Sequence, residues 1–244
     1  MNIELDRIYN MDCLEGMKAI PDGSVDAVIC DLPYGTTRNP WDSVIPLDLL
    51  WAEYRRITKP NAAIVLFSQQ PFTSALVMSN PQMFRYEWIW QKEMGTGFLN
   101  AKKMPLKDHE NVMVFYRDLP TYNPQMKQGE PYRCKNGALS SNYGDRQQVE
   151  TINNGERYPT TTVQFDRDPE RFHPTQKPVD LLRYLVLTYT NEGDTVLDNC
   201  MGSGTTAIAC IKEKRHFIGF ELSKEYFDKA VRRIDNERRQ LTLF

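Results

Sequence analysis

The sequence predicts an α/β protein with a Rossmann-like, doubly wound and mostly parallel sheet. Three observations support this fold class. Short runs rich in apolar and β-branched residues alternate with amphipathic helical segments near both ends of the chain. The run 62–67 is wholly apolar, as in a parallel sheet covered on both faces. Finally, a short strand is followed by Gly-x-Gly-x-x-Ala at 202–207, where a helix begins.

Composition narrows the class of protein. The 244 residues are 41% hydrophobic and 25% charged, which is ordinary for a soluble globular protein. No apolar run is long enough to cross a bilayer, and the polar N-terminus does not resemble a signal peptide, so we expect a cytoplasmic protein. Five cysteines without CxxC spacing and three scattered histidines predict neither a disulfide framework nor a metal site. A net charge of −2 leaves nucleic-acid binding to a local basic patch.

The elements follow from periodicity and from breaker residues. In the first half, strands are predicted within 3–12 and at 25–30, 62–67, 86–90 and 111–116, and helices at 14–20, 47–57 and 72–78. After residue 173, helices are predicted at 179–187, from the glycine loop to 214 and from 223 to 239, with strands at 195–198 and 217–221.

Residues 118–172 lack clear periodicity and are rich in Pro, Gly, Asn, Gln, Tyr and Arg. An irregular stretch of this length is usually functional or disordered. We interpret it as a target-recognition insertion, with partial disorder as the alternative. It would divide one domain into a catalytic half, 1–117, and a cofactor-binding half, 173–244.

Two groups of basic residues and one tryptophan have less certain roles. Lysines in the segment after residue 91 could contact phosphate or simply form a solvated face, and Trp41 could line a pocket or belong to the core. The arginine pairs of the last helix are predicted to be solvated. These basic residues are Lys92, Lys102, Lys103, Lys107, Arg232, Arg233, Arg238 and Arg239.

A carboxylate and an aromatic ring follow the strand 25–30. The segment reads Asp31-Leu32-Pro33-Tyr34, and its proline prevents simple continuation of a central strand. Ligands of open α/β sheets bind at the carboxyl ends of the strands. Tyr34 offers a stacking face for a flat substrate, and Asp31 can accept a hydrogen bond from an amino group. The alternative is an ordinary strand-end turn with a solvated acid.

The glycine loop indicates a second ligand site. Glycines let the backbone approach a ligand closely, and Glu221 ends the next strand, where a carboxylate can hold ribose hydroxyls. No Lys-Ser/Thr follows at the spacing of a P-loop. Too few residues follow Gly204 to complete a sheet, so the remaining strands must precede the loop, and the order of the motifs is permuted.

With Asp31-Leu32-Pro33-Tyr34 first and the glycine loop last, the chain resembles the β-group of amino-methyltransferases that act on DNA. This family carries an (Asp/Asn/Ser)-Pro-Pro-Tyr motif, in which Leu32 here replaces the first proline, and a Phe-x-Gly-x-Gly-type loop, in which Cys200 stands where Phe is usual. The resemblance implies S-adenosylmethionine as cofactor. It implies that Asp12-Cys13 contact its adenine, Glu221 its ribose, and Thr175-Gln176-Lys177 its methionine carboxylate. The implied cofactor loop comprises Asp198, Asn199, Gly202, Ser203, Gly204 and Thr205.

The resemblance also implies a mechanism. The Asp31 carboxylate and the Leu32 carbonyl would accept both N–H bonds of an exocyclic amino group, and the freed lone pair would attack the sulfonium methyl in line. A base in double-stranded DNA must be flipped out to reach such a site, where Tyr34 would stack on it. No Pro-Cys pair occurs, so C5-methylation of cytosine has no candidate nucleophile.

The resemblance favours N6 of adenine as the target because the motif begins with Asp, with N4 of cytosine as the alternative. A nicotinamide-dependent oxidoreductase, a catalytically silent DNA-binding module and an RNA methyltransferase are more remote alternatives. A homodimer and a cognate restriction endonuclease are compatible with the resemblance, in the cytoplasm of a bacterial or phage-infected cell.

Overall fold

The computed structural model describes residues 2–35, 43–135, 150–170 and 175–241. The chain forms two compact units, one from Met1–Asn123 with Thr161–Phe244 and one from Pro124–Thr160. Trp41 and the segment His173-Pro174 lie outside the described residues.

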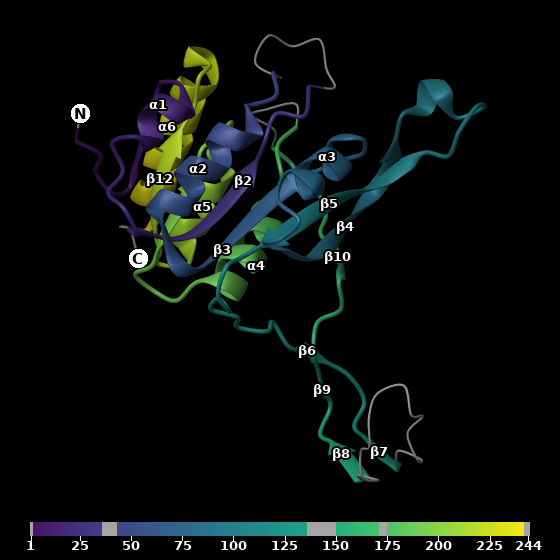
Figure 1. Ribbon diagram of the computed structural model, residues 1–244. Coiled ribbons are helices and arrows are strands. Elements are labelled where there is room, and N and C mark those ends of the chain that lie inside the picture. The colour runs from purple at the N-terminus through teal and green to yellow at the C-terminus, as the bar shows by residue number, and fades with distance from the viewer. Residues whose placement is uncertain (1, 36–42, 136–149, 171–174, 242–244) are drawn as a thin grey trace. The chain divides into compact units, whose positions relative to one another are not determined.

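The first unit is built on an eight-stranded sheet (Figure 1). The strand β5 is antiparallel to both of its neighbours, and every other pairing is parallel. This confirms the predicted mostly parallel α/β sheet with permuted motif order. In spatial order the strands are β1 (Arg7–Tyr9), β12 (His216–Phe220), β11 (Thr195–Asp198), β2 (Val25–Asp31), β3 (Thr58–Ser68), β5 (Lys107–Phe115), β4 (Phe84–Thr96) and β10 (Thr162–Gln164).

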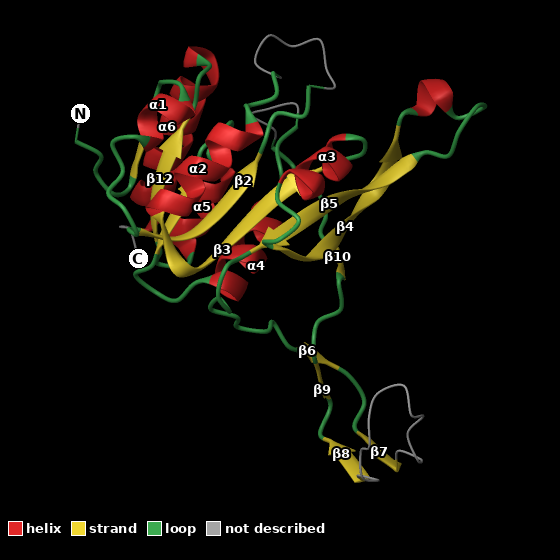
Figure 2. Ribbon diagram, viewed as in Figure 1, coloured by secondary structure: helices red, strands yellow, loops and turns green. Residues whose placement is uncertain are grey.

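Helices cover both faces of this sheet (Figure 2). One hydrophobic core lies between the sheet and the first three helices, and a second core lies between the sheet and the last three. The central strand β2 is buried from both sides, which explains its continuous run of apolar residues. The first set is α1 (Cys13–Met17), α2 (Leu47–Ile57) and α3 (Phe72–Ser79), and the second is α4 (Val179–Tyr189), α5 (Thr205–Lys212) and α6 (Lys224–Leu241).

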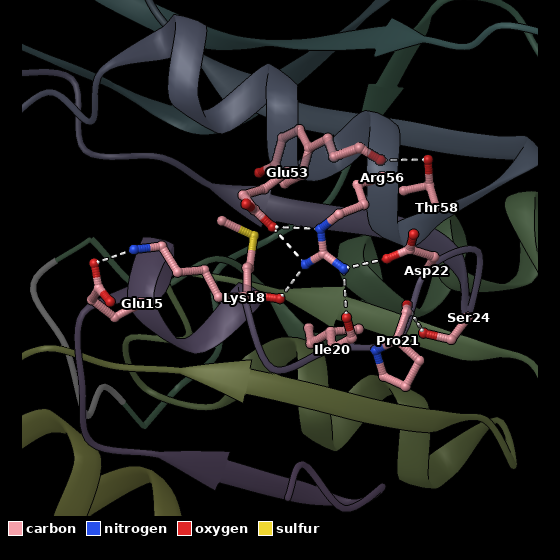
Figure 3. Close-up of polar contacts among 11 residues, drawn as sticks. Glu15, Lys18, Ile20, Pro21, Asp22, Ser24, Glu53, Arg56 and Thr58 are labelled. Atoms are coloured by element: carbon pink, nitrogen blue, oxygen red, sulfur yellow. Dashed lines mark hydrogen bonds and ion pairs between the residues drawn. The ribbon is translucent and has the colours of Figure 1, made fainter. Parts of the chain in front are cut away.

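Arg56 of α2 fixes the turn that leads from α1 into β2 (Figure 3). Its guanidinium donates to the carbonyl oxygens of Met17 and Ile20, at 2.7 and 2.8 Å, and to the carboxylates of Asp22 and Glu53, at 2.6 and 2.7 Å. The planar fork of arginine suits such a set of diverging acceptors. The start of β2 is therefore held in place, and with it the register that delivers Asp31 to the far end.

The strands β4 and β5 are longer than the apolar pattern predicts. They form a ribbon that pairs Gln91 with His109 and, after an irregularity, Thr96 with Lys107. A short 3-10 helix, η1 (Phe98–Asn100), lies near its turn. Backbone pairing requires no apolar side chains, so the polar residues at 107–110 gave no strand signal in the sequence.

The second unit consists of two small antiparallel pairs, β6 (Lys127–Gln128) with β9 (Glu156–Arg157) and β7 (Tyr132–Lys135) with β8 (Glu150–Asn153). The Arg157 guanidinium lies 4.6 Å from the centre of the Tyr132 ring, and Gly155 has a φ of +106° that favours glycine. This unit is narrower than the expected insertion 118–172, because β10 belongs to the sheet of the first unit. Its role in recognition remains a prediction.

Candidate active site

A pocket of about 240 Å³ opens at the carboxyl ends of β2, β3, β11 and β12. Its lining includes every predicted site residue except Gly204, although these residues come from both ends of the chain. Parallel neighbours explain the convergence, because β11 lies beside β2 and their carboxyl ends therefore meet at one edge of the sheet. The lining includes Asp12, Cys13, Asp31, Leu32, Pro33, Tyr34, Thr175, Gln176, Lys177, Asp198, Asn199, Gly202, Ser203, Thr205 and Glu221.

Asp31 ends β2 with its carboxylate in a dense polar environment. The Tyr34 hydroxyl donates to Oδ1 at 2.6 Å, and the Lys177 ammonium donates to Oδ2. A carboxylate oxygen has two acceptor sites, so each oxygen can accept one more hydrogen bond from a ligand. The carboxylate is therefore oriented by two partners and still able to bind an amino group.

Lys177 is shared between two carboxylates. Besides its bond to Asp31, its ammonium lies 3.2 Å from Oε2 of Glu110, which accepts no hydrogen bond among the described residues. Lys92 pairs with the other oxygen of Glu110 at 2.5 Å. The expectation that Lys92 contacts phosphate or solvent is wrong, since its side chain is only 10% exposed. Asp31, Lys177, Glu110 and Lys92 thus form one buried chain of alternating charges.

Burial and charge act in opposite directions on the pKa values of this chain. Burial, assisted by the negative charge of Glu110, raises the pKa of Asp31, although Lys177 and Tyr34 partly offset the rise. Burial lowers the pKa of Lys177, but Asp31 and Glu110 outweigh it, so that the pKa lies above that of a free lysine. Burial likewise raises the pKa of Glu110, but Lys177 and Lys92 outweigh it and the pKa is lowered.

The aromatic ring beside Asp31 is supported from behind. Tyr34 stacks on Phe72 of α3 with ring centres 5.4 Å apart and an interplanar angle of 29°. One face of the Tyr34 ring is therefore covered by protein, and a planar ligand must use the other face. Leu32 is buried in the core beside the first three helices, which explains why an apolar residue can stand there.

The glycine loop is held by the acid that follows β12. Glu221 accepts a hydrogen bond from the Gly202 amide at 2.8 Å and another from the Ser223 amide at 2.7 Å. Burial raises the pKa of its carboxyl, although these amides lower it. The carboxylate is thus fixed at the pocket wall, and each oxygen keeps a free acceptor site for a hydroxyl group.

The start of the loop is fixed by Asp198 at the end of β11. It accepts hydrogen bonds from the Cys200 amide at 3.0 Å and the Thr206 hydroxyl at 2.6 Å. Burial raises the pKa of Asp198 to about 6. The neighbouring Asn199 amide oxygen accepts from the Tyr54 hydroxyl of α2 at 2.5 Å. Both side chains therefore have structural partners besides any contact with a ligand.

Gly204 lies under the pocket, where it begins α5. Its φ is +80°, and a Cβ there would lie 3.2 Å from the Cβ of Ala230 in α6. Arg233 of α6 donates to the Ser203 carbonyl at 3.1 Å and the Thr205 hydroxyl at 2.9 Å. The expectation that Arg233 is solvated is therefore wrong. Arg238 is wrongly predicted as well, because it donates to the Asp6 carbonyl at 2.6 Å.

The remaining predicted contacts lie at the ends of the pocket. Asp12 is the N-cap of α1 and accepts from the amides of Leu14 and Glu15. Cys13 beside it is buried. On the other side, the Gln176 amide donates to Asp168 at 2.8 Å, and Thr175 is exposed. Asp12 and Gln176 thus have protein partners, which hold them at the pocket.

The pocket suits an adenosyl cofactor. A Cβ built on Gly202 would meet only the Cys200 carbonyl oxygen, at 3.9 Å, so the backbone faces open space that a ligand can approach closely. Fixed carboxylates stand at Glu221 and Asp12 and an ammonium stands at Lys177. These groups can respectively bind hydroxyls, an amino group and a carboxylate.

Two searches found no further site features. Among the described residues no group of three or more His, Cys, Asp or Glu side chains could hold a metal ion. No helix in the same part of the chain has the length and apolar character needed to span a membrane.

A mostly parallel sheet with a glycine loop and an acid–aromatic motif at one edge defines a methyltransferase-like α/β protein. The model of the DNA methylase family matches residues 25–232. The chain therefore belongs to the DNA methylase family, which confirms the expected resemblance and, at the level of the family, DNA methylation with S-adenosylmethionine.

Known proteins place the chain among both adenine and cytosine enzymes. It is 27% identical to the DNA adenine methyltransferase YhdJ of Escherichia coli K12 over 95% of this chain and 83% of that protein. The crystal structure of the M1.HpyAVI–SAM complex shares 25% identity, covers 93% of this chain and 98% of its own, and has a TM-score of 0.65. The cytosine-N4-specific PvuII DNA methyltransferase has a TM-score of 0.68 at 16% identity, covering 98% of this chain and 93% of its own.

Several residues of the site were not predicted from the sequence. Glu110 and Gln69 line the pocket, and Phe72 supports Tyr34. Glu110 starts the apolar part of a strand, where an acid usually marks only the solvated end. Its one distinguishing signal is burial among positive charges, which requires the pairing of β4 with β5 to be known.

Proposed function

We propose that this DNA methyltransferase transfers a methyl group to the N6 amino group of adenine in double-stranded DNA. The carrying observation is the carboxylate of Asp31, oriented by Tyr34 and Lys177 at the edge of the pocket. The Asp that begins the motif and the similarity to an adenine methyltransferase support adenine as the target. The likeness to a cytosine-N4 enzyme, at 16% identity, bears on the fold alone.

S-adenosylmethionine supplies an electrophilic methyl group on its sulfonium sulfur. The chain's part is to bind and orient it. Glu221 would hold the ribose hydroxyls, the Gly202 backbone would lie against the cofactor, and Asp12 with Cys13 would contact its adenine. Thr175, Gln176 and Lys177 would hold the methionine carboxylate, with Lys177 serving both this group and Asp31.

The target amino nitrogen is a poor nucleophile because its lone pair is delocalised into the base. The carboxylate of Asp31 and the carbonyl of Leu32 accept its two N–H bonds and draw the nitrogen toward tetrahedral geometry. The lone pair then forms the N–CH₃ bond while the S–CH₃ bond breaks and its electron pair stays on sulfur. Asp31 is next to the proton that the nitrogen must finally lose. Positioning and electrostatic stabilisation supply most of the rate.

The base must leave the duplex to reach this pocket. Tyr34 receives it on the ring face not covered by Phe72. Stacking of this kind is typically worth about 1–3 kcal/mol per base and offsets part of the cost of flipping. Recognition of the DNA sequence would fall to the segment 118–172, whose core is the second compact unit.

Nucleoside mass spectrometry of DNA treated with the protein and S-adenosylmethionine tests the assignment. N6-methyladenine is the expected product, and N4-methylcytosine as sole product would replace adenine by cytosine as the target. Binding of NAD in place of S-adenosylmethionine in a calorimetric titration would favour the oxidoreductase alternative.

A further inference from the structure

The turn of the β4–β5 ribbon carries an unusual set of exposed apolar side chains. We call residues 97–106 the arm tip. Phe98 is 75% exposed, Leu99 84% and Met104 57%. Apolar residues this exposed and this close together mark an interaction surface more often than chance exposure does. The arm tip is therefore shaped for contact with a partner that accepts apolar groups.

The charge of the arm tip indicates the class of this partner. Residues 97–106 contain Lys102 and Lys103, both exposed, and no Asp or Glu. Two copies of such a surface would repel each other. A DNA duplex offers what the tip lacks, namely a negatively charged backbone outside and an apolar stack of bases inside. Charge complementarity therefore favours DNA over a second copy of the chain.

The base of the ribbon lies at the pocket. Glu110 of β5 and Gln69 both line the pocket, and the Lys107 ammonium donates to the Gln69 amide oxygen at 2.8 Å. The pair Thr96 and Lys107 closes the ribbon just before the arm tip. Figures 1 and 2 show the ribbon continuing beyond the rest of the sheet from this end. DNA placed with a base in the pocket would thus have the arm tip nearby.

We propose that the arm tip enters the duplex at the target and that Phe98 and Leu99 occupy the space in the stack that the flipped base leaves. Apolar wedges of this type hold bases apart in other DNA-binding proteins. Lys102 and Lys103 contact the flanking phosphates. This inference rests on the proposed base flipping, and it assigns to the arm tip the task of keeping the base outside the duplex.

The test uses the double variant Phe98→Ser/Leu99→Ser and a duplex with the methylated site mapped for the wild-type protein. Leu119→Ser is the matched control, because Leu119 is 79% exposed and lies outside the pocket lining. Single-turnover methyl transfer should fall about ten- to hundred-fold for the double variant, the range of one lost stacking contact. The control should keep the wild-type rate. Calorimetry should give unchanged affinity for S-adenosylmethionine.

A second duplex, with a mismatched partner opposite the target adenine, separates a wedge from a simple binding contact. Mispairing lowers the cost of flipping, so the double variant should regain most of its rate on it. Lys102→Gln/Lys103→Gln should instead weaken binding of both duplexes alike and reduce the salt dependence by about two phosphate contacts.

Three results would overturn the inference. One is wild-type transfer by Phe98→Ser/Leu99→Ser on the paired duplex, and another is no recovery on the mismatched one. The third is a wild-type dimer in light scattering that this variant converts to a monomer, which would assign the arm tip to a second copy. Failure of the wild-type protein to methylate either duplex would instead count against the proposed function.

Discussion

Asp31 is the side chain on which the proposed chemistry depends most directly. Its carboxylate faces a nitrogen that becomes electron-rich and then cationic, so its interaction strengthens toward the transition state. Asp31→Ala should lower the single-turnover rate about a hundred- to a thousand-fold, or roughly 3–4 kcal/mol. Asp31→Asn is the sharper test because it keeps the shape and removes the charge. Cofactor affinity, titrated on the same preparations, should change no more than a few-fold. Wild-type transfer by Asp31→Ala would exclude the catalytic role.

The charge chain around Lys177 predicts how the rate depends on pH. The reactive form of Asp31 is ionised, so kcat/KM falls as the pH drops through the pKa of Asp31. Burial raises that pKa, which places the acid limb above the range of an ordinary aspartate. Lys177→Met removes a charge that lowers the pKa, so the limb should move to higher pH. Glu110→Gln removes a charge that raises it, so the limb should move to lower pH.

Lys59→Met is the control for these profiles. Lys59 pairs with Asp26 of the same strand at 2.5 Å, and neither residue lines the pocket. Its acid limb should coincide with that of the wild type. Shifts of Lys177→Met and Glu110→Gln in the same direction would contradict the assignment of the limb to Asp31.

At the scale of single residues, the sequence predicted the pocket better than its charge balance. Asp31, Tyr34, Glu221 and the glycines follow strands or begin a helix, and such positions can be read from periodicity. Lys177 was expected to bind only the cofactor, and its contact with Asp31 spans 146 residues of sequence. Glu110 and Arg233 were not identified because long-range pairing, not local pattern, decides which charges are buried.

Among the elements, the glycine loop at the start of α5 makes the clearest prediction. Gly204→Val places a branched side chain at a φ of +80° and within 3.2 Å of Ala230. The loop must shift, and affinity for S-adenosylmethionine should fall at least about tenfold, which is 1.4 kcal/mol. Gly193→Val is the matched control, since Gly193 has a φ of +83° and no atom near its added Cβ. Both variants should lose thermal stability, but only the first should lose affinity in calorimetry.

Helices and buried strands were predicted closely, and exposed strands were not. The helix 47–57 and the strand 195–198 have the predicted bounds. The ribbon of β4 and β5 extends well beyond the apolar runs at 86–90 and 111–116. Apolar periodicity reports which face of an element is buried, so it gives no signal where a strand is solvated on both sides.

At the scale of the whole molecule, the two compact units predict a division of labour. Asn123 is tied to the carbonyls of Leu187 and Thr190, and the Thr161 carbonyl accepts from Ile89, so cuts after 123 and before 161 leave the sheet intact. Exchanging 124–160 for the corresponding segment of a related DNA methylase should change the methylated sequence. Sequencing with modified-base detection measures this, and cofactor affinity should stay constant. Survival of the original target sequence would place recognition elsewhere.

The position of β2 in the middle of the sheet has a consequence for the protein's synthesis. Its neighbour β11 and the partner of β1, β12, come from the last fifty residues of the chain. A nascent chain therefore exposes one edge of β2 until translation is almost complete. Pairings so distant in sequence also make closure of the sheet slow. The carboxyl ends of β2 and β11 meet only then, so a ribosome-bound chain stalled before residue 195 can bind neither cofactor nor base.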